Sequence, residues 1–541
     1  MNLLNTQTKS ISFASLILAG SYLLSALLGI FRDRLLAGRF GLSNELDAYY
    51  SAFTIPDFIA LILIFGAISA AIIPIFNSYL VRSKDEAWHY INNLLNIFLS
   101  FLIVASLISI IFAPLLIHLI APGFSPEKKE MTVMLMRIMF LSPIILGTSS
   151  IISGILQVFH RFLVTALAPI MYNVGIIIGI LFFVPKFGLV GLAFGVVFGA
   201  LLHLLIQIPA FLHSGFKYRP VFDLKSPGIK KTFKLMLPRS LGLGAGQLNT
   251  ITVTAIASTL MSGSIAVFTV AHNLSSLLIN AIAASLSTVI FPAMSKAFSR
   301  EDIHDFKRKF NSAFSQILFL SIPISIEIFL LRAQIIRVFY GTGKVTWMDT
   351  RLAAACLGIF SLGLFAQGLI FLLSKTFYAA HNTKIPAIIS GATVAFNISM
   401  SFLFIWLLSF TNAFSDFLHV ILKMQTVQNI SVVGLALAFT ITAICEALLL
   451  LFFVHKKLRI FHLSQVAKSL YKIIISGSVM GVVILLIRNG LVYYNIVNLQ
   501  TTLGVFLQLI LSALAGLICY IIIAFMLKTE ELTKIKGLFK K

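Results

Sequence analysis

The chain has 541 residues, of which 59% are hydrophobic and only 11% are charged. A soluble protein carries roughly a quarter charged residues, so this composition excludes a water-soluble enzyme. The apolar residues fall in runs long enough to cross a bilayer as helices. The formal net charge of +23 is therefore interpreted as membrane topology and not as nucleic-acid binding.

The apolar runs predict fourteen membrane-spanning helices, with loops too short to hold a folded soluble domain. The predicted spans are 11–31, 51–80, 91–120, 131–158, 163–184, 187–213, 235–260, 264–293, 311–332, 351–378, 385–410, 430–455, 470–494 and 503–527. Any binding or chemistry is therefore expected within the helix bundle or at its ends.

Lysine and arginine are unevenly distributed between the loops. They concentrate at 217–234 and 296–309, on the side of the N-terminal tail, whereas the turn near 262–264 carries none. Cytoplasmic loops of membrane proteins carry an excess of positive residues. This pattern predicts that both termini are cytoplasmic.

Two short patterns recur six predicted spans apart. The first, S-x-x-x-[IF]-P, ends one helix at Pro74 and another at Pro292. The second runs from a histidine to an asparagine, at 160–173 and 381–397. Chance similarity between apolar helices is the alternative for either pair alone. Because six is an even number, a duplication would give two halves of the same orientation, a parallel repeat.

The repeat predicts an all-α fold with two six-helix lobes and two further helices. The expected divisions are an N-terminal lobe at 1–215, a basic cytoplasmic linker at 216–234, a C-terminal lobe at 235–456, and the last two helices with a basic tail at 457–541. Such repeats usually place a substrate cavity between the halves, with access alternating by rocking.

Ionisable groups within the spans cost about 2.5–3.5 kcal/mol each on insertion scales, so each needs a reason. Arg239 is the strongest candidate, because the glycines and proline around it indicate an irregular helix that is tolerated only beside protein or a water-filled cavity. Arg32 and Asp33 are either cavity charges or a structural ion pair. His272 is either a packed interior histidine or a polar group of the cavity, and Glu446 is a candidate ion-coupling carboxylate.

Motifs of soluble enzymes are missing from the sequence. It has no P-loop, G-x-S-x-G, H-E-x-x-H or paired carboxylates at working spacing, and its three cysteines form no zinc pattern. We therefore predict a transporter without catalytic residues, metal or cofactor. An ion gradient of sodium or protons, the membrane potential or the substrate gradient would supply the energy.

Several ordered motifs resemble those of the MurJ (MviN) family of lipid II flippases. They are GIFRDRLLA at 29–37, LDAYYSAF at 46–53, LPRSLG at 237–242, FPAMSK at 291–296, YGTG at 340–343 and FYAAHNTKIP at 377–386. The resemblance extends from about residue 15 to 455. It implies the fold of the MOP transporter superfamily, two six-helix lobes plus two helices, which agrees with the predicted repeat.

The resemblance implies that the chain moves a lipid-linked peptidoglycan precursor from the inner to the outer leaflet of the plasma membrane, for cell-wall synthesis. We expect membrane lipid and a polyprenyl diphosphate substrate as partners, no nucleic acid, and a monomer. Arginine suits a diphosphate because its donors form a fork. By motif, Arg32, Asp33 and Asp47 match the family's functional charges.

The resemblance and the polar residues together give three groups of candidate residues. The predicted substrate-binding residues are Arg32, Asp33, Asp47, Arg239, His272 and Asn273. The predicted structural or gating residues are Pro56, Gly66, Pro74 and Pro292. The predicted ion-coupling residues are Asn397 and Glu446.

The sequence also departs from the family pattern. Ala26, Leu61 and Asn273 stand where the family has arginines, and Ser401 stands where its sodium site has an acidic residue. These replacements favour an alternative function: a flippase for another lipid-linked oligosaccharide, or a cation-coupled exporter of the same superfamily. A third hypothesis is a membrane scaffold that keeps the fold without transport.

Overall fold

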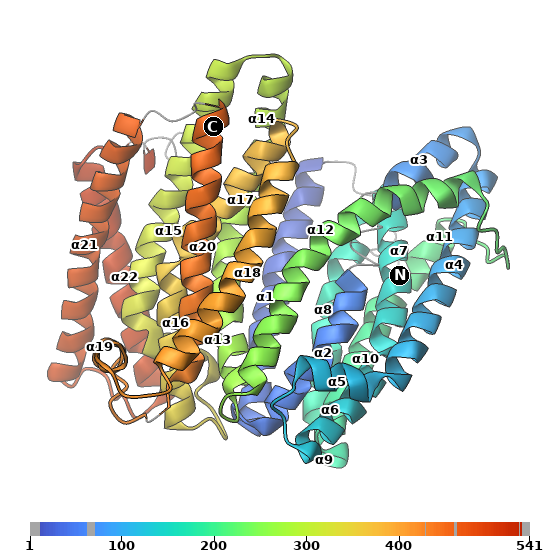
Figure 1. The fold of residues 1–541 in the computed structure, drawn as a ribbon. Helices are drawn as coiled ribbons and strands as arrows, with labels where there is room; N and C mark the ends of the chain where they lie inside the picture. Colours follow the sequence, from blue (N-terminus) through green and yellow to red (C-terminus); the bar gives the residue numbers. More distant parts are fainter. Residues whose placement is uncertain (1–10, 62–70, 428, 459–462, 530, 533–541) are drawn as a thin grey trace. The chain divides into compact units, whose positions relative to one another are not determined.

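The computed structural model describes residues 11–61, 71–427, 429–458, 463–529 and 531–532, and the regular structure within these ranges is entirely helical (Figure 1). The chain divides into two compact units, Met1–Ile265 and Ala266–Lys541.

The first unit contains the helices that carry the N-terminal motifs. They are α1 (Ile11–Phe40), α2 (Asn44–Ala60), α3 (Ile73–Arg82), α4 (Lys84–Ile111), α5 (Ala113–Ile120), α6 (Pro126–Met139), α7 (Leu141–Val158), α8 (Phe162–Ile178), the π-helix η4 (Gly179–Phe183), α9 (Val184–Phe187), α10 (Val190–Leu205), α11 (Ile208–His213) and α12 (Pro227–Ser258). Serine side chains accept hydrogen bonds from the first turns of three of these helices, at Ser43, Ser83 and Ser125. Such caps explain why the helices begin where they do.

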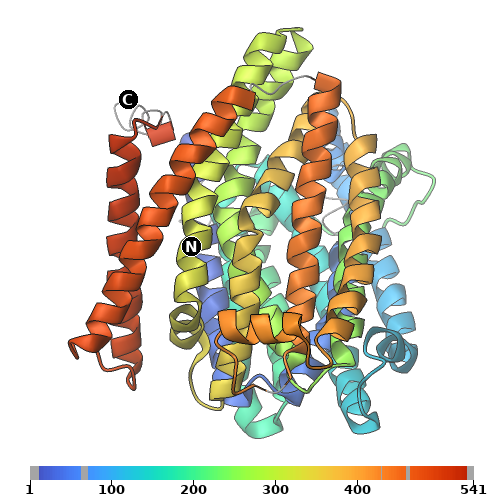
Figure 2. The same cartoon turned by 60° about the vertical axis from the view of Figure 1, so that its left-hand side comes forward.

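The second unit is built around one long helix. Its elements are α13 (Ser264–Ile279), the π-helix η5 (Asn280–Ala284), α14 (Ser285–Ser299), α15 (Ile303–Tyr340), α16 (Trp347–Leu362), α17 (Leu364–Ala379), α18 (Lys384–Leu407), α19 (Ala413–Ile421), α20 (Ser431–Leu458), α21 (Leu463–Tyr493) and α22 (Thr502–Met526). The long helix α15 packs against α14, α16, α17, α21 and α22. Helices α21 and α22 lie side by side in both views (Figures 1 and 2).

Ten helices of the described residues are long and apolar enough to cross a membrane, or eleven if α16 and α17, bent by 46° at Gly363, form one broken span. They correspond to eleven of the predicted spans. Of the other three predictions, 11–31 adjoins and 51–80 includes residues outside the description, and 235–260 falls on α12, where several side chains lie outside it. The all-helical membrane fold is confirmed, and the count of fourteen stays a prediction.

The turn predicted to repeat has the same backbone geometry in both units. His160, after α7, and His381, after α17, both adopt the left-handed conformation, with φ of 58° and 55°. The residue after each histidine donates its backbone N–H to a carbonyl five positions earlier, at 2.9 Å in both cases. This is the Schellman arrangement at a helix end. The two turns are therefore locally equivalent.

The boundary between the compact units differs from the predicted lobe boundary. Helix α12 packs against α2, α4 and α5 and belongs to the first unit, whereas the sequence prediction grouped 235–260 with the C-terminal lobe. The two compact units are defined by which helices pack together, whereas the predicted lobes are defined by the sequence repeat. The packing therefore does not test the lobe boundaries, which stay a prediction.

Glycines bring α8, η4 and α10 into backbone contact. A Cβ added at Gly175 would lie 2.3 Å from the Cα of Gly199, and a Cβ added at Gly179 would lie 2.4 Å from the Cα of Gly195. Small residues four apart allow this close approach, which supplies packing where lipid offers no hydrophobic driving force. This contact fixes α8, the helix that carries Asn173.

Gly195→Ala tests this contact. The new methyl group would lie 2.8 Å from the Cα of Gly179, and overpacking typically costs about 1–3 kcal/mol, so we expect a lower midpoint of thermal unfolding. Gly391→Ala is the matched control, because nothing lies within 4 Å of its Cβ position and alanine favours a helix by about 1 kcal/mol. Equal midpoints for the two variants would contradict the assignment.

Candidate functional site

Helix α1 continues to Phe40, well beyond the span predicted at 11–31. Arg32 and Asp33 therefore lie about two helical turns inside the end of a continuous helix. The sequence left open whether Arg32 belongs to the interior of the bundle. Its helical position and its 23% exposed side chain place it in a partly enclosed environment.

Arg32 is held on two sides by polar partners. Its Nε and Nη2 donate to Oδ1 of Asp33 at 2.9 and 2.7 Å. Its Nη1 donates to Oδ1 of Asn173 on α8 at 3.1 Å. The predicted ion pair is therefore present, and it is part of a larger network that connects α1 to α8.

Asn173 is itself held in place and is 8% exposed. Its amide nitrogen donates to the carbonyl and hydroxyl oxygens of Ser25 at 3.2 and 3.1 Å, and to the carbonyl oxygen of Pro169 at 3.2 Å. These contacts fix which end of the amide faces Arg32. The guanidinium is thereby held in a defined orientation.

The hydrogen bonds of Arg32 leave part of its donor set unused. A guanidinium has five N–H donors in a planar fork, and the contacts with Asp33 and Asn173 use three of them in the described part of the chain. One N–H remains on each terminal nitrogen. Two such donors match the oxygens of a phosphate or carboxylate, so the arrangement can bind an anion.

Further titratable side chains lie within electrostatic range of Arg32. Tyr49 and Asp57 come from α2, and Tyr172 comes from α8. Two carboxylates, those of Asp33 and Asp57, therefore accompany a single guanidinium. The cluster therefore contains side chains of both charge signs.

Asp47 lies in a second cluster within the first unit. Its Oδ2 accepts from Nζ of Lys128 at 2.8 Å and from the backbone N–H of Gly263 at 2.7 Å. The side chains of Asp47 and Lys128 are only 2% and 11% exposed. Lys128 also donates to Oδ1 of Asn44 at 2.8 Å and lies 4.0 Å above the ring of Phe124. We call this group the Asp47 clamp.

The turns around the Asp47 clamp meet at backbone distance. A Cβ at Gly263, whose φ is +86°, would lie 2.0 Å from the carbonyl oxygen of Leu42. Gly123 donates its N–H to Oγ of Ser258 at 3.1 Å, and a Cβ there would lie 2.4 Å from the Ser258 carbonyl oxygen. The end of α12 is therefore fastened to α2 and to the turn before α6.

His272 and Asn273 lie on α13 in the second unit. The His272 ring stacks on Phe268 at a centroid distance of 5.9 Å and meets Phe360 and Phe439 edge to face at 5.6 and 5.1 Å. This is the environment of a packed interior histidine. Asn273 is exposed. The predicted role of both residues in substrate binding stays a prediction.

The predicted ion-coupling residues lie on two packed helices of the second unit, α18 and α20. Asn397 is 2% exposed, and Oγ of Ser401 donates to its Oδ1 at 3.5 Å. Glu446 lies within hydrogen-bonding reach of Ser390 and Thr393. These oxygen-rich groups are of the kind that bind hard cations.

The predicted prolines lie on three different helices. Pro56 is buried inside α2, Pro74 is exposed at the start of α3, and Pro292 is exposed inside α14. Arg239 belongs to α12, but its side chain lies outside the described residues, as does Gly66. No structural role is assigned to these two.

Two partners in these clusters were not predicted as site residues. Asn173 entered the sequence analysis only through the repeat, although a buried amide in an apolar helix is itself a signal that a partner is needed. Lys128 lies in the first turn of α6, which Ser125 caps, and the sequence of this polar turn has no unusual feature. Nothing local in the sequence connects it with Asp47, 81 positions away.

Comparison with known proteins identifies the family. The family model described as lipid II flippase MurJ matches residues 36–505. A protein of Buchnera aphidicola named "Probable lipid II flippase MurJ" is 32% identical over 380 residues, 69% of this chain and 74% of the relative. One of the same name from Bdellovibrio bacteriovorus is 27% identical over 544 residues, 98% of each chain.

Solved structures give the same result. A structure described as lipid II flippase MurJ in an inward closed conformation matches with a TM-score of 0.75 and 26% identity, covering 95% of this chain and 99% of that one. A multidrug resistance MATE transporter of the MOP superfamily matches with a TM-score of 0.63 at 17% identity, over 82% of this chain and 96% of that one, which shows a shared fold alone. On the evidence of the family model, the relatives and the fold, this chain is a member of the MurJ family.

Proposed function

We propose that the chain moves lipid II from the cytoplasmic to the outer leaflet of the plasma membrane by alternating access, for cell-wall synthesis. It is then a transporter and not an enzyme. The observation that carries the proposal is the Arg32 network, which presents two oriented N–H donors from a membrane helix. Family membership supports the same cargo.

The chemistry of the cargo fits this arrangement. Lipid II joins a polyprenyl tail to a polar head through a diphosphate. The tail can remain in lipid, whereas the diphosphate needs cationic donors once it leaves water, because an unpaired charge in a low-dielectric site is costly. The outer edge of the Arg32 guanidinium supplies a bidentate contact of this kind.

We infer the orientation of the chain from the positive-inside rule. The basic stretches 217–234 and 296–309 are then cytoplasmic, as are both termini. The turns of the Asp47 clamp lie at the outer end of the first unit in this orientation. The clamp would close that end and would have to open during transport.

We propose that an ion gradient or the membrane potential supplies the energy for transport, and that the protein has no resident cofactor. Asn397, Ser401 and Glu446 offer oxygen ligands for sodium in the second unit. Asp57, within electrostatic range of Arg32, offers a proton site next to the proposed diphosphate contact. The proposed acting form is a monomer.

A second candidate is export of another lipid-linked oligosaccharide, or of a small molecule in exchange for a cation. Uncharged residues, Ala26, Leu61 and Asn273, replace the arginines that the resemblance leads us to expect. Preference for lipid II over undecaprenyl monophosphate in a binding assay separates the first proposal from this one.

Substitution of Arg32 tests the proposed function. We expect that Arg32→Ala will fail to restore growth of a flippase-depleted cell at unchanged protein abundance, because it removes the guanidinium donors. Arg32→Lys keeps a charge beside Asp33 but loses the planar donors, so it should also fail. Arg39→Ala, on the exposed last turn of the same helix, is the matched control and should grow. Normal growth of Arg32→Ala would contradict the assigned role.

Substitution of Asp47 tests the clamp. Removing one partner of a buried ion pair typically costs about 3–5 kcal/mol, so Asp47→Ala should lower the midpoint of thermal unfolding strongly. The double variant Asp47→Ala, Lys128→Ala should be less destabilised than the sum of the single variants.

The control for the clamp is the exposed pair Arg219–Asp85, whose side chains are 48% and 73% exposed. Arg219→Ala should change stability by no more than about 1 kcal/mol. If the stability losses of Asp47→Ala and Lys128→Ala simply added in the double variant, the two side chains would not be coupled.

A further inference from the structure

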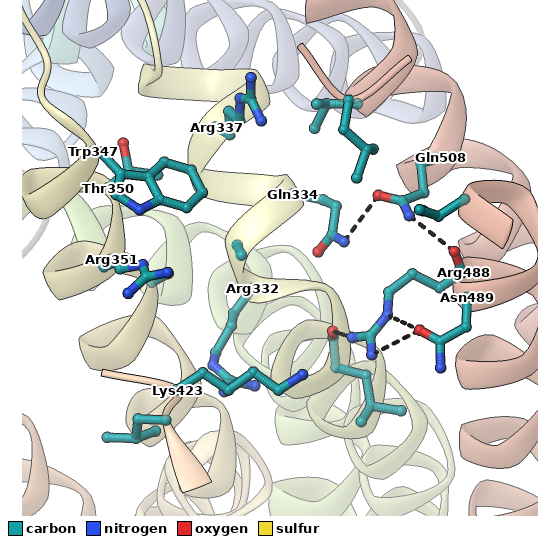
Figure 3. A pocket seen from close by; sticks show the side chains of 17 residues that line it. Arg332, Gln334, Arg337, Trp347, Thr350, Arg351, Lys423, Arg488, Asn489 and Gln508 are labelled. Atoms are coloured by element: carbon teal, nitrogen blue, oxygen red, sulfur yellow. Dashed lines mark hydrogen bonds between the residues drawn. The ribbon is translucent and has the colours of Figure 1, made fainter. Parts of the chain in front are cut away.

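A cationic pocket lies in the second unit, apart from the residues discussed above. It has a volume of about 360 Å³ and is bordered by α15, α16, α21, α22 and the residues after α19. Five of its lining residues are basic (Figure 3): Arg332, Arg337, Arg351, Lys423 and Arg488. We call it the five-cation pocket.

No carboxylate balances these charges among the described residues. The lining contains neither aspartate nor glutamate, and the ion pairs of the described chain involve other residues. Like charges gathered in one pocket repel each other, the more so where water is limited. The arrangement therefore calls for an anion from outside the chain.

Two of the arginines are fixed by backbone carbonyls. Nη1 of Arg488 donates to the Leu330 carbonyl at 2.8 Å, and Nη2 of Arg332 donates to that of Ile421 at 3.1 Å. Gln334 and Gln508 form a hydrogen bond across the pocket between α15 and α22 at 3.0 Å. The walls are thus connected by polar contacts and keep their charged groups in defined positions.

Trp347 contacts two of the five basic side chains (Figure 3). The guanidinium carbons of Arg337 and Arg351 lie 5.9 and 5.0 Å from the centroid of its ring. An aromatic face holds such a cation without neutralising it. Both arginines consequently keep charge available for a ligand.

Lys423 occupies a backbone position that favours glycine. It follows α19 with φ of 57°, where a residue with a Cβ is disfavoured. Its side chain lines the pocket. The chain therefore places a lysine where glycine would satisfy the backbone at lower cost.

The pocket lies where membrane helices end. It includes the last part of α15 and α21 and the first part of α22. Helices α21 and α22 also carry exposed apolar side chains such as Leu486 and Leu503, which are 66% and 67% exposed. Lipid phosphates occupy this level of a bilayer. We propose that the five-cation pocket binds a phosphate group, carried by a lipid headgroup or present as a free anion.

Two binding measurements on the purified full chain test this proposal. Native mass spectrometry compares phosphatidylglycerol with phosphatidylcholine of the same acyl chains. Isothermal titration calorimetry measures inorganic diphosphate. The pocket variants are Arg351→Gln and Lys423→Gly, the second of which also relieves the backbone, so it should fold. Lys384→Gln, an exposed cation of the same unit outside the pocket, controls for net charge.

We expect wild type to prefer phosphatidylglycerol, and each pocket variant to lose about tenfold in that affinity while Lys384→Gln retains it. This result would identify a lipid headgroup as the source of the bound phosphate group. Diphosphate binding that the pocket variants alone weaken, without lipid preference, identifies a free anion. The proposal would be overturned if neither phosphatidylglycerol nor diphosphate bound, or if Lys384→Gln lost as much affinity as the pocket variants. Because transport is not measured, failure here leaves the proposed flippase function untouched.

Discussion

A partly buried guanidinium on α1, a predicted membrane helix, is the constraint on which the account of this protein depends. Placing an arginine there costs about 2.5–3.5 kcal/mol on insertion scales unless partners compensate. Asp33 supplies the compensating charge and Asn173 the second acceptor. Because the two partners use only part of the donor fork, the same contacts that stabilise Arg32 also aim its remaining donors. In the proposed function, one network supplies both stability and the contact with the anion.

The surrounding helices serve to keep this network in place. Glycines at 175, 179, 195 and 199 bring α8 against α10 at backbone distance, which fixes the helix that carries Asn173. At the end of the same unit, Asp47, Lys128 and Gly263 fasten α12 to α2. The first unit therefore combines close packing around the arginine with an ionic contact at the end of its helices.

Much of this could be predicted from the sequence, and the reasons for the rest are physical. Hydropathy identifies the membrane helices because lipid requires long apolar runs. The adjacent opposite charges of Arg32 and Asp33 make an ion pair one of two interpretations of their motif. The first predicted span ended at residue 31 because the charges at 32–34 resemble the end of a span, whereas α1 continues to Phe40. The Lys128–Asp47 contact was missed because it joins residues 81 positions apart, a separation that periodicity and local motifs do not encode.

The measurement that tests the central claim most directly uses Asn173, which touches Arg32 without carrying charge. Native mass spectrometry would compare lipid II with undecaprenyl monophosphate on wild type and Asn173→Ala, which retains Arg32 but removes the partner that orients it. The account predicts that wild type prefers lipid II and that the variant loses on the order of tenfold in lipid II affinity, with the monophosphate little changed. Equal binding of the two lipids by wild type, or undiminished preference in the variant, would contradict it.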